Sequence, residues 1–174
     1  MKIAWMCLLL AVPALAQQPT APIPAACGSN TTAFEVTVDP SQHTLQQSGA
    51  GKALVYFIQD DGPDGNHQHF ITKVALDGAW VGAYKNNSYF AVSVEPGVHH
   101  VCARVQSKSR IGDTLALAHF TAEAGKTYYF TTRFPGGLNA LYPVPPYLLL
   151  SRLDSDEATY LISLYPLSIS HPKK

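Results

Sequence analysis

The chain has 174 residues, and its 12 Lys and Arg residues balance 12 Asp and Glu residues. This length suits one domain with a sizeable core, and the balanced charge excludes the basic surface that nucleic-acid-binding proteins need. Beyond the first residues, no apolar run is long enough to cross a membrane.

Residues 1–16 have the pattern of a secretory signal peptide. Met1-Lys2 gives a positive start, an apolar run follows to Val12, and Ala14-Leu15-Ala16 is a small-x-small cleavage site. We therefore expect an extracytoplasmic protein, whether periplasmic, envelope-associated or secreted. Residues 17–33 are rich in proline at their start and are expected to form a flexible leader.

Two of the three cysteines remain after removal of the signal, which contains Cys7. An even pair in an oxidising compartment predicts a disulfide between Cys27 and Cys102. A lipid-anchored Cys27 after Ala25-Ala26 is the alternative, which Pro24 disfavours. A pair of free thiols is less expected outside the cytoplasm.

Short apolar or alternating segments, separated by Gly and Pro turns, follow the leader. They predict strands at 34–38, 53–59, 70–76, 80–83, 89–94, 98–106, 115–122, 127–133 and 147–153. Residues 53–59 are apolar on both faces, which indicates a central strand. Asp77-Gly78, Glu95-Pro96-Gly97 and Glu123-Ala124-Gly125 are tight turns.

One helix is predicted after the last of these strands. Asp154 is its expected N-cap, with Glu157 three residues later. Apolar residues recur at helical spacing at Ala158, Leu161, Ile162 and Tyr165, and Pro166 ends the run. Residues 167–174 are expected to form a polar tail.

The pattern predicts an all-β fold, an antiparallel β-sandwich of about 7–9 strands with one short C-terminal helix, over residues 34–166. Strand alternation assigns these residues to one core: Val55, Phe57, Phe90, Val92, Val94, Val101, Ala103, Val105, Tyr128 and Phe130. No β–α alternation suggests a cofactor crevice, so no cofactor is expected.

Several segments together resemble a known bacterial family. They are Gly51-Lys52-Ala53-Leu54-Val55-Tyr56, Leu76-Asp77-Gly78-Ala79-Trp80-Val81-Gly82, Tyr89-Phe90, Val94-Glu95-Pro96-Gly97-Val98-His99 and Ala124-Gly125-Lys126-Thr127-Tyr128-Tyr129-Phe130. The chain resembles the secreted or lipoprotein-type family called domain of unknown function 2846. The turn segments are also similar to small envelope β-domains named for a Pro-Glu-Gly-Ala motif. Both resemblances imply a bacterial, extracytoplasmic β-sandwich, and neither implies an activity or a catalytic residue.

The chain carries no Gly-x-Ser-x-Gly elbow, no His-Glu-x-x-His helix and no phosphate-binding glycine loop, which favours a non-enzymatic protein. His67 and His69 are the candidate zinc or copper ligands. The simpler interpretation of their segment is a solvated polar loop, and we favour it. His99 and His119 are interpreted as partly buried, hydrogen-bonded histidines. The apolar loop 134–147 fits either a cover over a sheet edge or an exposed recognition patch.

If consecutive strands alternate in direction, the long connections at 60–69, 84–87, 107–114 and 134–146 all lie at one end of the sandwich, which we call the long-loop end. The short turns lie at the other end, the short-turn end. The long-loop end would carry Asp64, His67, His69, Lys85, Asn87, Lys108, Arg110 and Tyr142. Sandwich domains usually bind through such grouped loops.

Three functions are compatible with these features. The first is a non-enzymatic domain that binds an envelope protein, peptide or glycan through the long-loop end. The second is a metal-binding or metal-dependent hydrolytic protein that uses His67 and His69. The third is a structural envelope component without a ligand.

Overall fold

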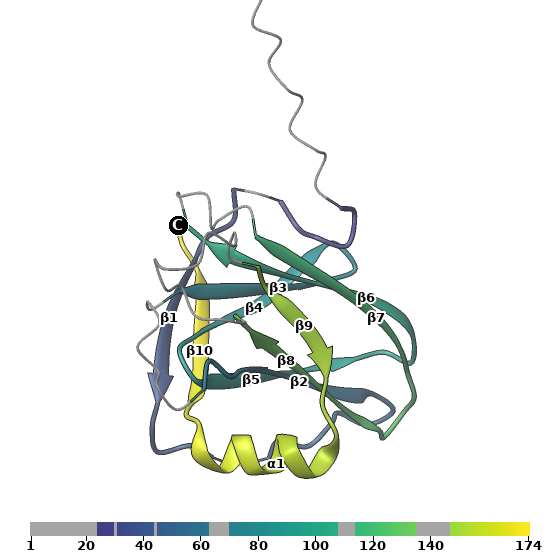
Figure 1. The fold of residues 1–174 in the computed structure, drawn as a ribbon. Coiled ribbons are helices and arrows are strands. Elements are labelled where there is room, and N and C mark those ends of the chain that lie inside the picture. The colour runs from purple at the N-terminus through teal and green to yellow at the C-terminus, as the bar shows by residue number, and fades with distance from the viewer. Residues whose placement is uncertain (1–23, 30, 44, 63–69, 108–113, 135–146) are drawn as a thin grey trace, which may run out of the picture.

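Two packed β-sheets and one helix make up the fold of the computed structural model (Figure 1). The structure describes residues 24–29, 31–43, 45–62, 70–107, 114–134 and 147–174. Its elements are β1 (Phe34–Asp39), β2 (Ala53–Gln59), β3 (Ile71–Leu76), β4 (Ala79–Lys85), β5 (Ser88–Val94), β6 (Gly97–Gln106), β7 (Leu115–Ala122), β8 (Thr127–Arg133), β9 (Leu149–Arg152), α1 (Ser155–Leu164) and β10 (Leu167–Pro172). The all-β sandwich predicted from the sequence is confirmed.

The larger sheet has the strand order β1-β10-β5-β2-β8-β9, and the smaller sheet has the order β4-β3-β6-β7. Most neighbours are antiparallel, as predicted, but β2 pairs with β8 and β10 pairs with β5 in parallel. The chain reverses direction at each connection between β2 and β8, and the number of these connections is even. Both strands therefore run the same way when the chain returns to the larger sheet.

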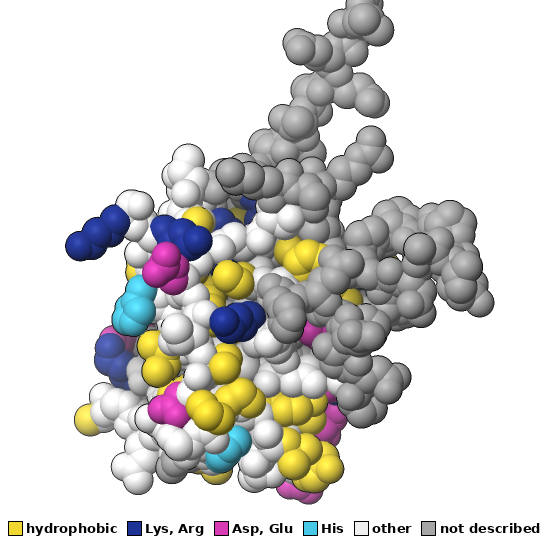
Figure 2. Space-filling model, turned by 90° about the vertical axis from the view of Figure 1, so that its left-hand side faces the viewer, with side chains coloured by type: hydrophobic (Ala, Val, Ile, Leu, Met, Phe, Trp, Pro, Cys, Tyr) yellow, Lys and Arg dark blue, Asp and Glu magenta, His cyan; other side chains and the backbone are white. Residues whose placement is uncertain are grey.

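The carboxyl-terminal segment differs from the prediction, which gave a polar tail over residues 167–174. Leu167–Pro172 is strand β10, which pairs with β1 over its whole length and meets β5 at Tyr89. The sequence did not indicate this strand, because only one face of β10 is buried and polar residues therefore alternate along it. This β1–β10 ribbon lies on the left of Figure 1 and faces the viewer in Figure 2, where charges of both signs are interspersed with small hydrophobic groups.

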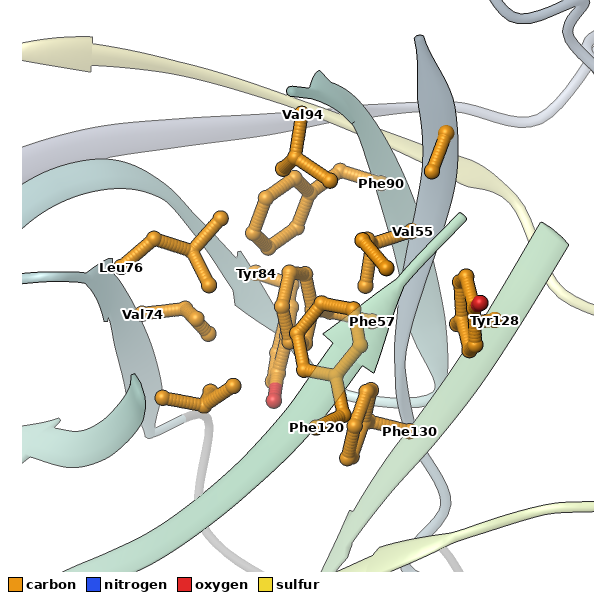
Figure 3. Packing of buried hydrophobic residues seen from close by; sticks show 13 residues of the cluster. Val55, Phe57, Val74, Leu76, Tyr84, Phe90, Val94, Phe120, Tyr128 and Phe130 are labelled. Atoms are coloured by element: carbon orange, nitrogen blue, oxygen red, sulfur yellow. The ribbon is translucent and has the colours of Figure 1, made fainter. Parts of the chain in front are cut away.

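The main core fills the space between the two sheets (Figure 3). Its aromatic rings include those of Phe57, Tyr84, Phe90, Phe120 and Phe130, and neighbouring rings among these lie 5.2–5.8 Å apart between centroids. The predicted core residues are buried as expected, except that Val92 is only partly buried. The sequence pattern therefore assigns the inner strand faces correctly.

Helix α1 covers the outer face of the larger sheet. Its Ala158, Leu161 and Ile162 pack on Tyr56 and Tyr89 of β2 and β5. This second core explains why β2 is apolar on both faces. The helix begins as predicted, because the Asp154 carboxylate accepts hydrogen bonds from two backbone N–H groups of the first turn, each 2.9 Å long.

Candidate functional site

The strand ends that border the long connections lie together at one end of the sandwich. In the smaller sheet, Ile71 at the start of β3 lies opposite both Lys85 and Gln106, the last residues of β4 and β6. In the larger sheet, the Asp60 N–H donates to the Thr132 carbonyl at 3.1 Å. These contacts place the ends of β4 and β6 together in one sheet and those of β2 and β8 together in the other, as strict alternation predicts. Tyr84 Oη of β4 lies 2.8 Å from Thr132 Oγ1 of β8, which brings the two sets of ends together.

The connection between β4 and β5 was predicted to be one of the long ones but is the two-residue turn Asn86-Asn87. Asn87 of this turn joins the two sheets at the long-loop end. Its side-chain carbonyl accepts a hydrogen bond from the Asp61 N–H at 2.8 Å, and its amide donates to the Gly62 carbonyl at 3.1 Å. The first residues of the β2–β3 connection are therefore held on the β4–β5 turn. Asn87 positions this loop start rather than presenting a free side chain to a ligand.

Of the other predicted site residues, only Lys85 lies in the described part of the chain. It is the last residue of β4, and its side chain is half-buried. The remaining candidates, Asp64, His67, His69, Lys108, Arg110 and Tyr142, lie outside the described residues. Within the described residues, no group of three or more His, Cys, Asp or Glu side chains is arranged to hold a metal ion.

A buried layer of polar side chains closes the core at the long-loop end. Its members come from both sheets and are Gln59, Thr72, Tyr84, Ser88, Thr132 and Ser168. Tyr84 Oη and Thr132 Oγ1 are 2.8 Å apart, and Ser88 Oγ lies 2.8 Å from Ser168 Oγ. Burial raises the pKa of Tyr84 well above its ordinary value, so its hydroxyl stays protonated.

Two polar atoms of this layer have no hydrogen-bond partner among the described residues. Gln59 donates its amide to Asp61 Oδ2 at 2.6 Å, but its Oε1 atom accepts no hydrogen bond, and Thr72 Oγ1 is also unpaired. Such buried atoms cost free energy relative to paired ones. The two unpaired atoms therefore lower the stability of the fold relative to a fully paired layer.

An ion-pair network beside this layer fastens α1 to the strand ends. Arg133 Nε donates to Asp60 Oδ2 at 2.9 Å, and its Nη2 lies 2.7 Å from Glu157 Oε1 on α1. Tyr165 Oη donates to the other Asp60 oxygen at 2.7 Å. The hydrogen bond to Glu157 and the charge of Asp60 raise the pKa of Arg133, which remains a cation.

The sequence pattern did not predict that Asp60, Arg133, Glu157 and Tyr165 form a group. Asp60 directly follows β2, and Arg133 ends β8, so both residues occupy strand ends that are visible in the sequence. What the sequence did not reveal was that β2 and β8 are neighbours. Only this parallel pairing brings the carboxylate and the guanidinium together.

The short-turn end contains a histidine–aspartate cluster. His99 Nδ1 lies 2.7 Å from Asp77 Oδ2, and His99 Nε2 lies 2.7 Å from the Glu95 carbonyl. Burial alone would lower the pKa of His99, but these two hydrogen bonds and the Asp77 charge outweigh it and raise the pKa. His99 thus matches its predicted role, whereas His119 is exposed on the outer face opposite His100 because its strand turns that face to solvent.

The predicted disulfide between Cys27 and Cys102 is present. It lies on the outer face of the smaller sheet with Ala75, beside Trp80. The same segment is fixed by hydrogen bonds from Trp80 Nε1 to the Ser29 carbonyl at 2.8 Å and from Lys73 Nζ to the Thr32 carbonyl at 2.7 Å.

Three consequences follow from this attachment. A thioether-linked lipid on Cys27 is incompatible with the bridge, so the alternative of a lipid-anchored Cys27 is not supported. Residues 24–29 and 31–33 are not a free leader but a strap across the smaller sheet. The bridge is compatible with an extracytoplasmic location.

No helix in the described residues is long and apolar enough to span a membrane. The described residues define a disulfide-bridged, all-β sandwich in which β2, β4, β6 and β8 all end at the same end of the molecule.

Comparison with protein families assigns the chain. The model of the family described as protein of unknown function (DUF2846) matches residues 49–142, more than half of the chain. The protein therefore belongs to this family, as its motifs indicated. No curated protein and no solved structure matches the chain.

Proposed function

We propose that this protein is an extracytoplasmic, non-enzymatic binding domain that recognises a protein, peptide or glycan through its long-loop end. The location is supported by the signal-peptide pattern of residues 1–16 and by the Cys27–Cys102 bridge. Periplasmic, envelope-bound and secreted forms are all compatible with these two features.

The observation that carries the proposal is the convergence of strand ends at the long-loop end. The Asp60 and Asn87 hydrogen bonds and the Arg133 ion pairs hold these ends in one rigid frame. Loops that start from a rigid frame bind at lower entropic cost than loops that must be ordered on binding. The connections that leave this frame carry Asp64, His67, His69, Lys108, Arg110 and Tyr142, beside Lys85.

Several side chains at the short-turn end are paired with one another. Its connections are the turns at Asp77-Gly78, 95–96 and 123–126. The β1–β2 connection, residues 40–52, also reaches this end, where the Gly125 N–H donates to the Lys52 carbonyl at 2.9 Å. Lys52 is paired with Glu95 at 2.7 Å, and His99 is paired with Asp77. This end is closed by interactions within the protein, so we assign binding to the opposite end.

A pull-down from the native envelope with the chain from Gln17 onward tests the proposal. The triple variant His67→Ala, Arg110→Ala and Tyr142→Ala should stay folded and lose the captured partner. The matched control replaces exposed residues at the short-turn end, His100→Ala and Lys126→Ala, and should retain it. Loss of the partner only in the control would overturn the assignment.

Elemental analysis of the purified protein addresses the competing metal hypothesis. Stoichiometric zinc or copper that disappears in a His67→Ala, His69→Ala variant would contradict a non-metal binding domain. A metal-free protein that still captures its partner is the result we expect.

A further inference from the structure

We propose that β7 is a pairing edge through which two copies of this protein associate, with the β7 strands antiparallel about a two-fold axis. The inference concerns a different surface from the long-loop end and does not depend on the proposed function. It rests on the direction of the backbone groups of β7 and on the contrast between β7 and the other sheet edges.

The backbone N–H and C=O groups of every second residue of β7 point toward the free edge of the strand. The Val105 N–H donates to the Thr114 carbonyl at 3.2 Å, which identifies this pair as a hydrogen-bonded pair of the β6–β7 ladder. In an antiparallel ladder such pairs alternate along the strand. The even-numbered residues of β7 therefore face β6. The N–H and C=O groups of Leu115, Leu117, His119 and Thr121 point away from the sheet.

No described segment pairs with this free edge. β7 is the last strand of its sheet and pairs only with β6 over the part of the chain that the structure describes. Leu117 is 49% exposed, and the side chains of His119 and Thr121 are also exposed. An eight-residue edge thus offers a row of backbone donors and acceptors next to accessible side chains.

The other sheet edges are protected, whereas β7 is not. At the β4 edge, the outward Ala83 N–H donates to Ser170 Oγ of β10 at 3.0 Å. The β1 edge carries the charges of Glu35 and Asp39, and β9 has only four residues. β7 contains no Lys, Arg, Asp, Glu, Pro or Gly, and its register with β6 has no bulge. Natural proteins normally blunt an exposed edge with one of these devices.

An extended, uncharged strand is the partner that fits this chemistry, and β7 itself is such a strand. A two-fold axis brings the outward groups of one copy to the outward groups of the other, provided that odd-numbered residues pair with odd-numbered residues. Leu117 of one copy then lies beside uncharged side chains of the second copy. Without residues 1–16, which contain Lys2, the chain has 11 Lys and Arg residues against 12 Asp and Glu residues, so net repulsion between copies is small. One edge pairing buries little surface, so a weak dimer is expected.

Light scattering over a concentration series tests the dimer. The average mass of the chain from Gln17 onward should rise from one copy toward two copies with concentration. The variant Leu117→Lys, His119→Lys places two charges on the edge and should remain a monomer. Val98→Lys is the matched control, because Val98 is 62% exposed on the same outer face but belongs to the interior strand β6. It should dimerise like the wild type.

Three results would overturn the proposal. The wild type could stay a monomer up to about 1 mM, the upper end of meaningful affinity. The double-lysine variant could dimerise as well as the wild type, which would place the interface elsewhere. Equal loss of association in the Val98→Lys control would indicate packing of the outer faces rather than pairing of the edges.

Residue-resolved amide exchange in the wild-type protein needs no substitution. The N–H groups of Leu117 and His119 should gain protection as concentration rises, whereas those of Ala116 and Ala118, which face β6, should be protected at every concentration. Protection of Leu117 and His119 that persists on dilution would show that the chain covers its own edge, and would contradict the proposal. Fast exchange at every concentration would contradict it equally.

Discussion

Tyr84 and Thr132 show how single residues close the core at the long-loop end. Their hydroxyl groups pair with each other between the sheets, where Tyr84 and Thr132 are fully buried. A buried hydroxyl without a partner costs more than an apolar group of the same shape. The stability of the polar layer therefore depends on both hydroxyl groups of this pair being present.

Tyr84→Phe should lower the free energy of unfolding by about 1–2 kcal/mol, because Thr132 Oγ1 loses its partner in a buried position. The double variant Tyr84→Phe, Thr132→Val removes both hydroxyl groups and should be less destabilised than the sum of the single variants. Urea unfolding of all four proteins measures this. A strictly additive result would show that the two hydroxyl groups are not coupled.

His99 should make stability depend on pH. Its folded pKa is raised above the ordinary value of 6.5, so the stabilisation is complete at lower pH and is lost as pH rises through the folded pKa. Asp77 has a lowered pKa, so its contribution is present above pH 3.8 and is lost as pH falls further. The free energy of unfolding should therefore decrease as the pH rises from about 6.5 through the raised folded pKa of His99.

The variant His99→Gln should flatten this dependence relative to the wild type. His100→Gln serves as the control, because His100 is more exposed and lies 3.9 Å from the Asp77 carboxylate. Urea unfolding across the pH series measures the difference. Identical pH profiles for the wild type and His99→Gln would contradict the role of His99.

At the scale of elements, the sequence predicted those features that arise within one segment. The apolar faces of β2 and the Asp154 cap of α1 are local, and both are observed. β10 was missed because its alternation of Leu, Ser, Ile and Ser is too polar to indicate a strand by itself. Its identity depends on pairing with β1, which is remote in the sequence.

The candidate site was predictable only in outline for the same reason. Alternation of strand directions placed the strand ends correctly, because it requires only the order of elements. The Asp60–Arg133 pair depends instead on β2 and β8 being neighbours, and the sequence carries no local signal for that pairing.

The packing of β4 against β5 gives an element-scale prediction. A Cβ atom on Gly82 would lie 2.6 Å from the Phe90 ring, which is fixed between the sheets. Gly82→Ala should therefore lower the free energy of unfolding by roughly 1–3 kcal/mol. Gly49→Ala is the control, because its Cβ would meet only the flexible Lys52 side chain at 3.6 Å. Equal stability of both variants in urea unfolding would show that β4 can move away from Phe90.

At the scale of the whole molecule, the disulfide links the amino-terminal strap to the middle of the smaller sheet. The bridge closes a loop of 75 residues. Without it, the strap would be held only by its hydrogen bonds and by the packing of Trp80.

Replacing both cysteines, Cys27→Ser and Cys102→Ser, should lower the free energy of unfolding by about 4 kcal/mol, chiefly because the unfolded chain gains freedom. Urea unfolding of the oxidised wild type, the reduced wild type and the double variant measures the effect. The last two should agree. An unchanged midpoint after complete reduction would show that the bridge does not stabilise the fold.

The long-loop end as the binding end is the central claim, and a backbone-amide NMR titration tests it most directly. The isotope-labelled chain from Gln17 onward is titrated with the partner recovered from the envelope. We predict that shifts concentrate at the long-loop end, with Asp61, Lys85, Asn87 and Arg133 as described reporters. Shifts concentrated at Asp77, His99 and Glu123 of the short-turn end would contradict the claim.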